Sequence, residues 1–425
     1  MLSFWYHIYN ILLIRAIVVF FKTYSLFNDK VKRGFKGRVD LFGHLERSLL
    51  LLPEINKNIL LHSSSLGEFQ QALPFTEKLL KKNKNVILSF FSPSGFENAK
   101  RPKGNVVKTY LPVDTKENAS RFLDIVNPEY IFFLRYDLWF NLMYEAKKRN
   151  IKLILVNARF DERDLSWKLP LASSFKKALY GMLDIAFAID ETDEKNYSDK
   201  LTHTKIVKVG DSKFERVFVA AKKVNTEILI DKRIIQDKKI FVMGSSWKDD
   251  EEVVLPALDK SLEFNSNLIT FLVPHEPKET KLKAIEERIN DRYPQLRAIR
   301  YSKMNGYKNE NLIIVDKIGI LMKLYALADL SYVGGGFRTG LHNILEPAIY
   351  NKPVFFSNKV KNSDEDEILI SSGCGIIVED TKQFYRRFRE LLGNDELRLS
   401  KGKKAELVFK NNLGIAKKIV KQLGI

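Results

Sequence analysis

The sequence contains very little cysteine and no internal repeat or long low-complexity tract. One of its 425 residues, Cys374, is a cysteine, so no intramolecular disulfide can form. Such scarcity is typical of proteins in a reducing compartment. Cys374 lies in a Ser-Gly-Cys-Gly segment without a neighbouring His or Asn, which favours packing over a nucleophilic role. Because 45% of the residues are hydrophobic, disorder is excluded and two folded domains are expected.

Acidic residues are fewer than basic residues. Lys and Arg number 70 against 52 Asp and Glu, a net charge of +18, which favours a membrane surface, a nucleic acid or a phosphorylated small molecule as partner. Zinc-finger spacing, ribonucleoprotein signatures and a helix-turn-helix pattern are lacking, so no nucleic-acid partner is expected. No Asp-x-Asp cluster ends a strand. We expect Asp249, Asp250 and the acids of 364–366 to be solvated, and no metal or cofactor to be needed.

The apolar N-terminus lacks an uninterrupted run of membrane-spanning length. Arg15 and Lys22 divide residues 2–27, whereas a bilayer requires about 20 apolar residues, and signal-peptide features are missing. The pattern predicts a helix lying in the membrane interface, or else a helix buried against its own domain. In the first case, the residues at headgroup depth are Trp5, Tyr6, Tyr9, Phe20 and Phe21. Cations that would add attraction to an anionic leaflet are Lys30, Lys32, Arg33, Lys36 and Arg38.

From residue 58 onward, short β-branched and aromatic runs alternate with longer amphipathic stretches. This alternation predicts an α/β fold with parallel sheets and crossover helices. Ligands of such doubly wound sheets bind at the carboxyl ends of the strands. The first series of predicted strands is 59–62, 86–91, 130–134, 152–156, 184–189 and 205–209. The second series is 239–243, 268–273, 312–315, 330–333, 353–356 and 375–378.

These series predict two Rossmann-like domains with additions at both ends. The charged segment between the series is expected to be a linker, and a Lys-rich helix is expected at the end of the chain. The predicted parts are an anchor helix and basic segment at 1–38, a first domain at 39–215, a linker at 216–238, a second domain at 239–400 and a helix at 401–425.

Glu68 follows the first predicted strand. A small-residue turn, Ser63–Gly67, delivers this carboxylate to the start of a helix. Acids commonly complement the helix dipole at such positions, and on the residues alone this structural role is favoured over catalysis. Pro74 would disturb a helix interior, so the regular helix is expected to begin near it.

Three consecutive glycines, Gly334–Gly336, follow the predicted strand at 330–333. They would let backbone N–H groups approach an anion, and a helix starting near Asn343 would offer its positive end to a phosphate. The spacing matches neither the Walker pattern nor GxGxxG, which disfavours an NTPase or a dehydrogenase. Glu346 is placed to accept hydrogen bonds from a ribose diol. The alternative is a glycine turn without a ligand.

Taken together, the motifs of the chain resemble one family. They include HSSSLGEFQQALP (62–74), LRYDLWFN (134–141), VNARFDER (156–163), VGDSKFERV (209–217), VPHEP (273–277), VDKIG (315–319) and GGGFRTGLHNILEP (334–347). Their identity and order are similar to those of the 3-deoxy-D-manno-octulosonic acid (Kdo) transferases of lipopolysaccharide synthesis, which are GT-B glycosyltransferases. The resemblance covers nearly all of the sequence.

The resemblance implies two Rossmann-like domains facing a cleft, at the cytoplasmic face of a bacterial inner membrane, with peripheral or monotopic attachment. It implies transfer of Kdo from CMP-Kdo to a lipid A precursor, lipid IVA, with inversion. Glu68 is then the general base, and Asp137 and Lys213 stabilise the transition state. The implied donor-binding residues are His275, Glu276, Ile318, Gly319, Ile320, Gly335, Gly336, Asn343, Ile344, Leu345 and Glu346.

The chain departs from the family pattern near Asp137. It has Arg135-Tyr136-Asp137 where the family often has Glu-Thr-Glu, so an arginine replaces a carboxylate. Arg135, Arg159 and Arg338 are candidates for binding a sugar carboxylate or a lipid phosphate, since guanidinium matches such anions bidentately; plain surface cations are the alternative. Two other functions stay open: a GT-B enzyme using a UDP-sugar, and a non-catalytic membrane-bound protein with a nucleotide fold.

Overall fold

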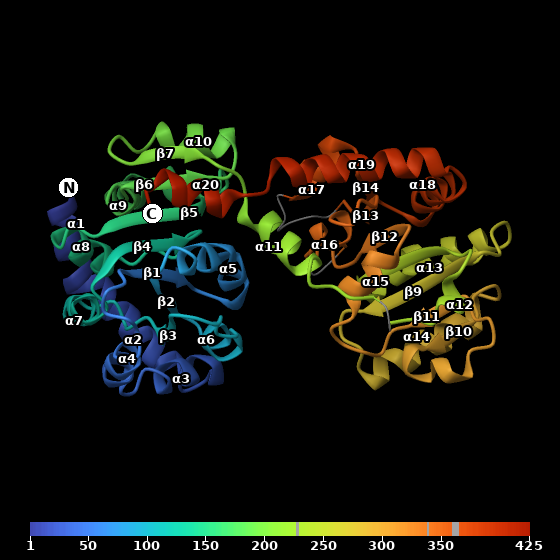
Figure 1. Ribbon diagram of the computed structural model, residues 1–425, viewed down its shortest axis with the longest axis horizontal. Helices are drawn as coiled ribbons and strands as arrows, with labels where there is room; N and C mark the ends of the chain where they lie inside the picture. Colours follow the sequence, from blue (N-terminus) through green and yellow to red (C-terminus); the bar gives the residue numbers. More distant parts are fainter. Residues whose placement is uncertain (227–228, 338–339, 359–364) are drawn as a thin grey trace. The chain divides into compact units, whose positions relative to one another are not determined.

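The chain divides into two compact units, each built on a seven-stranded parallel sheet (Figure 1). The computed structural model describes residues 1–226, 229–337, 340–358 and 365–425. The first unit comprises Met1–Arg216 and Gly414–Ile425, and the second comprises Val217–Leu413.

The first sheet has the strand order β3-β2-β1-β4-β5-β6-β7. The order reverses between β1 and β4, which is the place where doubly wound folds bind ligands. Its strands are β1 (Asn58–Ser63), β2 (Asn85–Phe90), β3 (Val106–Tyr110), β4 (Pro128–Leu134), β5 (Lys152–Ala158), β6 (Ile185–Ala188) and β7 (Lys205–Lys208). Its helices are α3 (Asp29–Lys36), α4 (Leu41–Leu49), α5 (Leu66–Leu80), α6 (Pro93–Asn98), α7 (Lys116–Val126), α8 (Phe140–Lys148), η2 (Leu165–Trp167), α9 (Pro170–Tyr180), α10 (Glu191–Ser198) and α20 (Ile415–Gln422).

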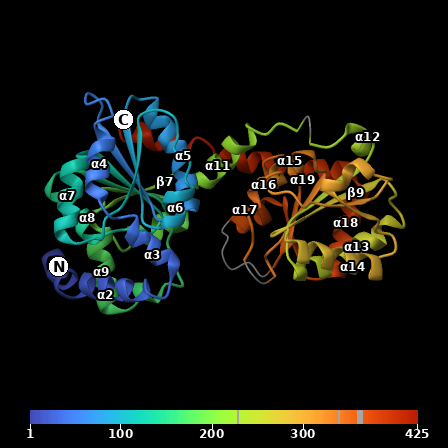
Figure 2. The same cartoon turned by 90° about the horizontal axis from the view of Figure 1, so that it is seen from below.

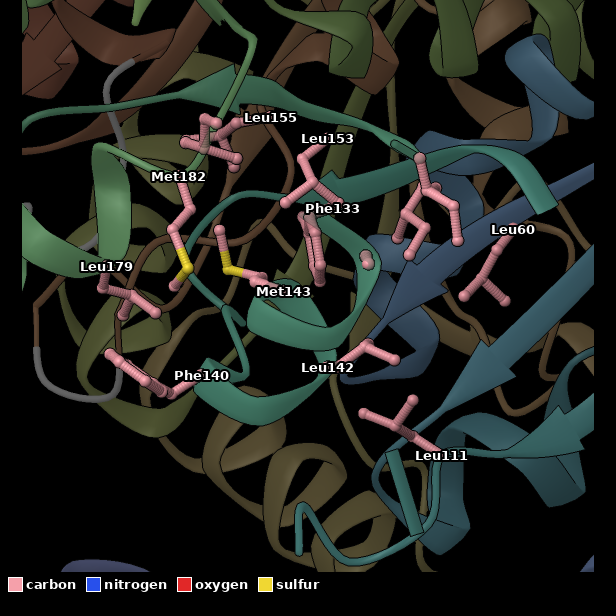
Figure 3. Close-up of a cluster of buried hydrophobic side chains, with 14 of the residues drawn as sticks. Leu60, Leu111, Phe133, Phe140, Leu142, Met143, Leu153, Leu155, Leu179 and Met182 are labelled. Carbon is pink, nitrogen blue, oxygen red and sulfur yellow. The ribbon is translucent and has the colours of Figure 1, made fainter. Parts of the chain in front are cut away.

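The strands of this sheet are apolar on both faces because helices cover both faces. Alternate residues of a strand point to opposite sides. Leu60 and Leu155 pack toward α8 and α9 in the cluster of Figure 3, whereas Leu61 and Val156 pack on the other face with side chains of α5 and α20. A sheet buried on both sides therefore appears in the sequence as continuous apolar runs.

The second sheet has the order β10-β11-β9-β8-β12-β13-β14 and is also parallel. Its strands are β8 (Lys239–Ser246), β9 (Leu268–Pro274), β10 (Ala298–Arg300), β11 (Leu312–Ile314), β12 (Leu330–Val333), β13 (Val354–Ser357) and β14 (Gly375–Val378). Its helices are α12 (Lys232–Ile235), α13 (Lys248–Leu262), α14 (Glu279–Arg292), η3 (Tyr301–Gly306), α15 (Leu321–Leu327), α16 (Leu345–Ala348), α17 (Glu365–Ser372), α18 (Thr381–Gly393) and α19 (Asp395–Asn411).

All twelve predicted strands are present, and the described residues contain two further strands that the sequence did not predict. The first, β3, follows the basic stretch at 100–103 and carries Lys108 in its middle, which hides its apolar character. The second, β10, has three half-buried residues at the edge of its sheet. A short edge strand such as β10 has a weak pattern because few of its side chains enter the core.

The prediction that the regular helix begins near Pro74 was wrong. Helix α5 starts at Leu66 and contains Pro74 as a buried interior residue. A capping box fixes this early start: Ser65 caps the helix, and the Glu68 side chain accepts a hydrogen bond from the Ser65 backbone N–H.

The N-terminal segment forms one helix whose faces differ. It runs from Leu2 to Tyr24 through α1 (Leu2–Ile8), η1 (Tyr9–Leu13) and α2 (Ile14–Tyr24). By length and composition alone it is apolar enough to cross a membrane in spite of Arg15 and Lys22, which the criterion of an uninterrupted apolar run did not allow for. Trp5 and Tyr9, expected at headgroup depth, are buried against the first unit. The Trp5 indole N–H donates to Ser174 Oγ (3.0 Å), and the Tyr9 hydroxyl donates to Asp114 Oδ2 (2.8 Å).

The opposite face of this helix stays exposed. Phe20 is 61% exposed, Ile11 and Val19 are each 64% exposed, and Tyr6, half-buried, stacks on Tyr144. The structure therefore combines both expected arrangements, since one apolar face packs on protein and the other faces outward.

The basic segment at 30–38 is also divided between two environments. Arg38 is not a surface cation: its guanidinium donates to the carbonyl oxygens of Gly34, Phe91 and Leu111 (each 2.8 Å). Burial lowers the pKa of Arg38 to about 10. Arg33 pairs with Glu97 at 2.8 Å. The exposed cations that leave a basic surface here are Lys30, Lys32 and Lys36.

The ends of the second unit differ from the predicted boundaries. Of the segment at 216–238, expected to be a linker, residues 216–221 belong to α11 (Ser212–Ala221) and residues 232–235 form α12. The expected single helix at 401–425 is two helices, because Gly414 takes a left-handed backbone conformation (φ 76°) between α19 and α20. Figure 1 shows α20 returning to the first unit, where it packs on α5.

Candidate active site

The residues singled out in the first unit lie at the carboxyl edge of its sheet. Glu68 follows β1, Asp137 follows β4, Arg159 follows β5 and Lys213 follows β7. Strands β1 and β4 are hydrogen-bonded neighbours with His62 opposite Phe133, so the loops after them adjoin each other. Parallel strands deliver their following loops to one edge, which is why residues distant in sequence gather there.

Glu68 has a structural role that the sequence also predicted. Its Oε2 atom accepts hydrogen bonds from the Ser64 N–H (2.5 Å), the Ser64 hydroxyl (2.5 Å) and the Ser65 N–H (3.2 Å). Within the part of the chain that the structure describes, these bonds all end on one oxygen. They hold the half-buried carboxylate at the tip of α5 and leave Oε1 for another partner.

Asp137 is oriented by His62, a residue that the sequence analysis did not select. The His62 ring is fully buried, with Nε2 2.8 Å from Asp137 Oδ2 and Nδ1 2.9 Å from Ser89 Oγ. A histidine between a hydroxyl and a carboxylate has little rotational freedom, so the carboxylate is fixed in turn. His62 is the last residue of a predicted strand, and a polar residue at a strand end was the sequence signal that could have identified it as a site residue.

Arg135 combines an unusual backbone conformation with a buried charge. Its φ of 63° is left-handed, a conformation that costs an L-residue about 1–2 kcal/mol. Its Nε and Nη2 atoms are buried, and neither has a hydrogen-bond partner among the described residues. Burying guanidinium N–H groups unpaired is costly, so the arrangement favours an anion brought by a ligand.

Lys213 and α5 are joined through a buried amide network. Asn157, at the end of β5, donates to Gln71 Oε1 (2.6 Å) and Ser212 Oγ (2.7 Å) and accepts from the Ser212 N–H (3.1 Å). Lys213 Nζ lies 4.0 Å from Asp211 Oδ2. The start of α11, which carries Lys213, is thereby fixed to α5, the helix that carries Glu68 in its first turn.

Arg159, the other arginine candidate of this unit, has a protein partner: its Nη1 lies 3.9 Å from Asp190 Oδ2.

In the second unit, three aromatic rings stack at the carboxyl edge. The Trp247 ring lies 4.8 Å from that of His275, which lies 4.3 Å from that of His342. The Trp247 indole N–H donates to His342 Nε2 (3.1 Å), so this nitrogen is unprotonated. Burial, with a smaller effect of His275, lowers the pKa of His342 to about 4. Of the three, only His275 was predicted as a site residue.

Asp250 organises the glycine loop, contrary to our expectation of a solvated acid. It is fully buried; Oδ2 accepts from the Gly335 N–H (2.9 Å) and Oδ1 from the Tyr332 hydroxyl (2.8 Å). Burial raises the pKa of Asp250 to about 6. Gly335 has φ 94°, and a Cβ there would lie 2.3 Å from Gly340 O, so only glycine fits. Glu365 and Asp366, also expected to be solvated, are buried as well.

The helix expected near Asn343 is shorter and starts later than predicted. Helix α16 covers only Leu345–Ala348. Its short length removes most of the dipole that we expected to face a phosphate. Asn343 Nδ2 instead donates to Glu346 Oε1 (3.1 Å), and its Oδ1 accepts from the Leu345 N–H (3.2 Å). Ile344 and Leu345 are buried in the core.

The remaining predicted donor residues have mixed environments. Glu276 lies near Lys278 and Lys281 (3.2 and 2.9 Å), and their hydrogen bonds lower its pKa. Ile318 is 83% exposed, whereas Ile320 is buried and Gly319 between them has φ 87°. Gly336 packs tightly, since a Cβ there would lie 2.4 Å from Ser357 Oγ. Arg338 lies outside the described residues.

No group of three or more His, Cys, Asp or Glu side chains in the described ranges is arranged to hold a metal ion. That the activity needs no metal or cofactor stays a prediction.

The chain is similar to known proteins in both sequence and fold. The family model of 3-deoxy-D-manno-octulosonic-acid transferases matches residues 36–216. A bifunctional glycosyltransferase/methyltransferase of Fusobacterium nucleatum is 30% identical over 385 residues, which cover 86% of this chain and 56% of that relative. The chain thus spans little more than half of that protein. A 3-deoxy-D-manno-octulosonic acid transferase of Haemophilus influenzae is 26% identical over 378 residues, 86% of each chain.

Among solved structures, UDP-GlcNAc 2-epimerase from Neisseria meningitidis bound to UDP-GlcNAc aligns with a TM-score of 0.59 at 13% identity, over 86% of this chain and 99% of that one. This likeness concerns the fold. Two parallel α/β units of this kind, with the sequence relatives, define a glycosyltransferase of the GT-B fold. Within that class, the chain is similar to the Kdo transferases, through the family model over residues 36–216 and relatives of 26–28% identity.

Proposed function

We propose that the protein transfers Kdo from CMP-Kdo to a lipid A precursor, lipid IVA, with inversion at the sugar centre. The observation that carries this proposal is the position of Glu68, whose Oε2 is held by three hydrogen bonds while Oε1 stays available at the switch point of the first sheet. The match of residues 36–216 to the Kdo transferase family model and the transferases among the relatives support the choice of sugar.

In this proposal the residues of the first unit act on the acceptor. Glu68 removes the proton of the attacking hydroxyl, a contribution of about 10²–10⁴-fold for general bases. Asp137, oriented by His62, and Lys213 stabilise the charges of the transition state. The unpaired guanidinium of Arg135 binds an anionic group of a substrate, a carboxylate or a phosphate, and Arg159 is a second candidate.

The second unit binds the nucleotide. We assign donor contacts to His275 in its ring stack, to the Gly335–Gly336 loop held by Asp250, and to the Asn343–Glu346 segment. The remaining assigned contacts are Glu276 and Ile318–Ile320. No step is assigned to a metal ion.

The N-terminal helix and the basic surface beside it attach the enzyme to the cytoplasmic face of the inner membrane. The exposed apolar side chains of the helix, among them Ile11 and Phe20, and the exposed Lys30, Lys32 and Lys36 support this placement.

The direct test is mass spectrometry of the lipid after incubation of the purified protein with CMP-Kdo and lipid IVA. We expect the lipid mass to increase by one or more Kdo units, and CMP but not UDP to inhibit competitively. Transfer from a UDP-sugar instead would indicate a GT-B glycosyltransferase with a different donor. Nucleotide binding without any product would indicate a non-catalytic protein.

A further inference from the structure

An apolar cavity of about 320 Å³ lies at the carboxyl edge of the first sheet, between α2, α3 and the loops after β2, β3 and β4. Figure 2 shows α2 and α3 beside each other there. Its walls include Val18 and Phe21 of α2, Val31 and Phe35 of α3, and Phe91 and Trp139. The volume falls within the range of about 300–1,000 Å³ that is typical of ligand sites.

The cavity is open on the side of the exposed helix face. Ile17 and Tyr24 line it and are 36% and 43% exposed, and Phe20 beside them is 61% exposed. An apolar cavity joined to an exposed apolar surface requires an apolar occupant, because water gains little in such a space. Lys30, an exposed residue of the same lining, supplies a cation for an anionic headgroup.

The inner wall of the cavity belongs to the loops of the candidate active site. The Ser92 N–H donates to the Ser64 carbonyl (3.0 Å), and Ser64 in turn holds the Glu68 carboxylate. Trp139, on the other wall, follows Asp137 by two residues. The indole N–H of Trp139 is buried and has no hydrogen-bond partner in the described ranges. An ester or amide carbonyl would satisfy it.

The floor of the cavity is preformed. The three carbonyl bonds of Arg38, and its stacking on Phe91 (5.0 Å) and Tyr110 (4.9 Å), lock the α3 wall to the loops after β2 and β3. A site that exists before binding loses less entropy when a flexible chain enters it.

We propose that this cavity binds one acyl chain of the lipid acceptor and thereby places the acceptor hydroxyl beside Glu68. The inference rests on the proposed function. It differs from membrane attachment, because it makes the acyl chain a part of substrate recognition.

The test compares Val18→Trp, which fills the cavity, with Val19→Trp, which adds the same ring to the exposed side of the same helix. Val19 is 64% exposed and is not a lining residue. The acceptors are lipid IVA and its fully deacylated form, and the donor is CMP-Kdo. We expect the parent to use the acylated acceptor at least tenfold more efficiently, in kcat/KM, than the deacylated one. Val18→Trp should reduce that preference to near unity with an unchanged KM for CMP-Kdo, and Val19→Trp should keep it.

Val31→Trp fills the same cavity from α3 and guards against misfolding of one variant. Equal behaviour of Val18→Trp and Val19→Trp would overturn the proposal, as would a loss in the filled variants that is the same for both acceptors. The acyl chain could also come from a membrane lipid rather than from the acceptor, and flotation of each variant with anionic vesicles distinguishes the two. If the filled variants lose vesicle binding in proportion to their activity, the cavity binds membrane lipid and the proposal is overturned. If the parent transfers Kdo to neither acceptor, the proposed function itself is refuted. If the parent uses both acceptors equally well, only the acyl-chain site is refuted.

Discussion

His62 and Asp137, 75 residues apart in the sequence, are joined by a 2.8 Å contact between Nε2 and Oδ2. The imidazole is fully buried and its other nitrogen lies 2.9 Å from Ser89 Oγ, so β1, β2 and the loop after β4 contribute to one polar chain. A carboxylate held in this way keeps a fixed direction at the sheet edge, which is the property that electrostatic catalysis requires.

From this geometry, Asp137→Asn should lower kcat about 10²-fold, the effect of losing one preorganised electrostatic contact. Steady-state kinetics with both substrates would measure it. Glu129→Gln is the control, because Glu129 is an exposed acid at the start of β4, the strand that precedes Asp137. A fall in kcat of less than about threefold for Asp137→Asn would remove it from the reaction.

Replacing Glu68 by glutamine separates its two roles. Glutamine at the third helical position still closes a capping box, so the thermal midpoint should not change. Without the base, the transfer rate should fall about 10²-fold or more. The control Glu77→Gln alters an exposed acid of the same helix and should leave the rate unchanged. A transfer rate above a tenth of that of the parent would exclude Glu68 as the base.

Arg135→Gly should weaken substrate binding without destabilising the free protein. Glycine adopts φ 63° without strain, and the variant no longer buries an unpaired guanidinium, so the free energy of unfolding should rise by about 1 kcal/mol. The KM of either CMP-Kdo or the lipid should rise about tenfold, the effect of losing a hydrogen bond to a charged group.

The substrate whose KM rises identifies the anion, the carboxylate of the sugar or the phosphate of the lipid. Asn150→Gly, at an exposed left-handed position (φ 56°) before β5, controls for the backbone effect and should change neither KM. If Arg135→Gly leaves both KM values unchanged, the guanidinium does not bind substrate.

The ring stack of the second unit should lose stability in acid. The pKa of His342 is lowered from its ordinary value near 6.5 to about 4, so the folded protein resists its protonation. The contribution is complete above pH 6.5 and is lost as the pH falls toward 4, because the unfolded chain binds the proton first. We expect a loss of about 1 kcal/mol, since the ring is only half-buried and water screens part of the effect.

Denaturant unfolding between pH 4 and 7 would measure this loss. His342→Gln keeps an acceptor for the Trp247 indole N–H and should show a flatter profile than the parent. His44→Gln changes an exposed imidazole on α4 and should leave the profile unchanged. Parallel profiles for the parent and His342→Gln would contradict the prediction.

The sequence predicted the α/β class and the larger strands because their apolar runs are buried on both faces and depend little on distant partners. Leu60 and Leu61 point to opposite sides of the sheet, and both are apolar. It did not reveal β3 or β10, whose residues are mixed or half-buried. Nor did it reveal that the Gly414 turn returns α20 to the first unit, since a turn defines where a helix ends but not its destination.

For the site, local sequence was enough to select Glu68 and the glycine loop, because strand ends, small-residue turns and consecutive glycines are local signals. The partners of these residues were decided by tertiary structure alone. His62 reaches Asp137 because β1 and β4 are neighbours, and Asp250 reaches Gly335 because β8 and β12 are neighbours. Hydrogen bonds between residues tens of positions apart depend on strand order, which no local pattern encodes. The same long-range packing holds Trp5 and Arg38 against the first unit, although the local sequence had placed both at a membrane surface.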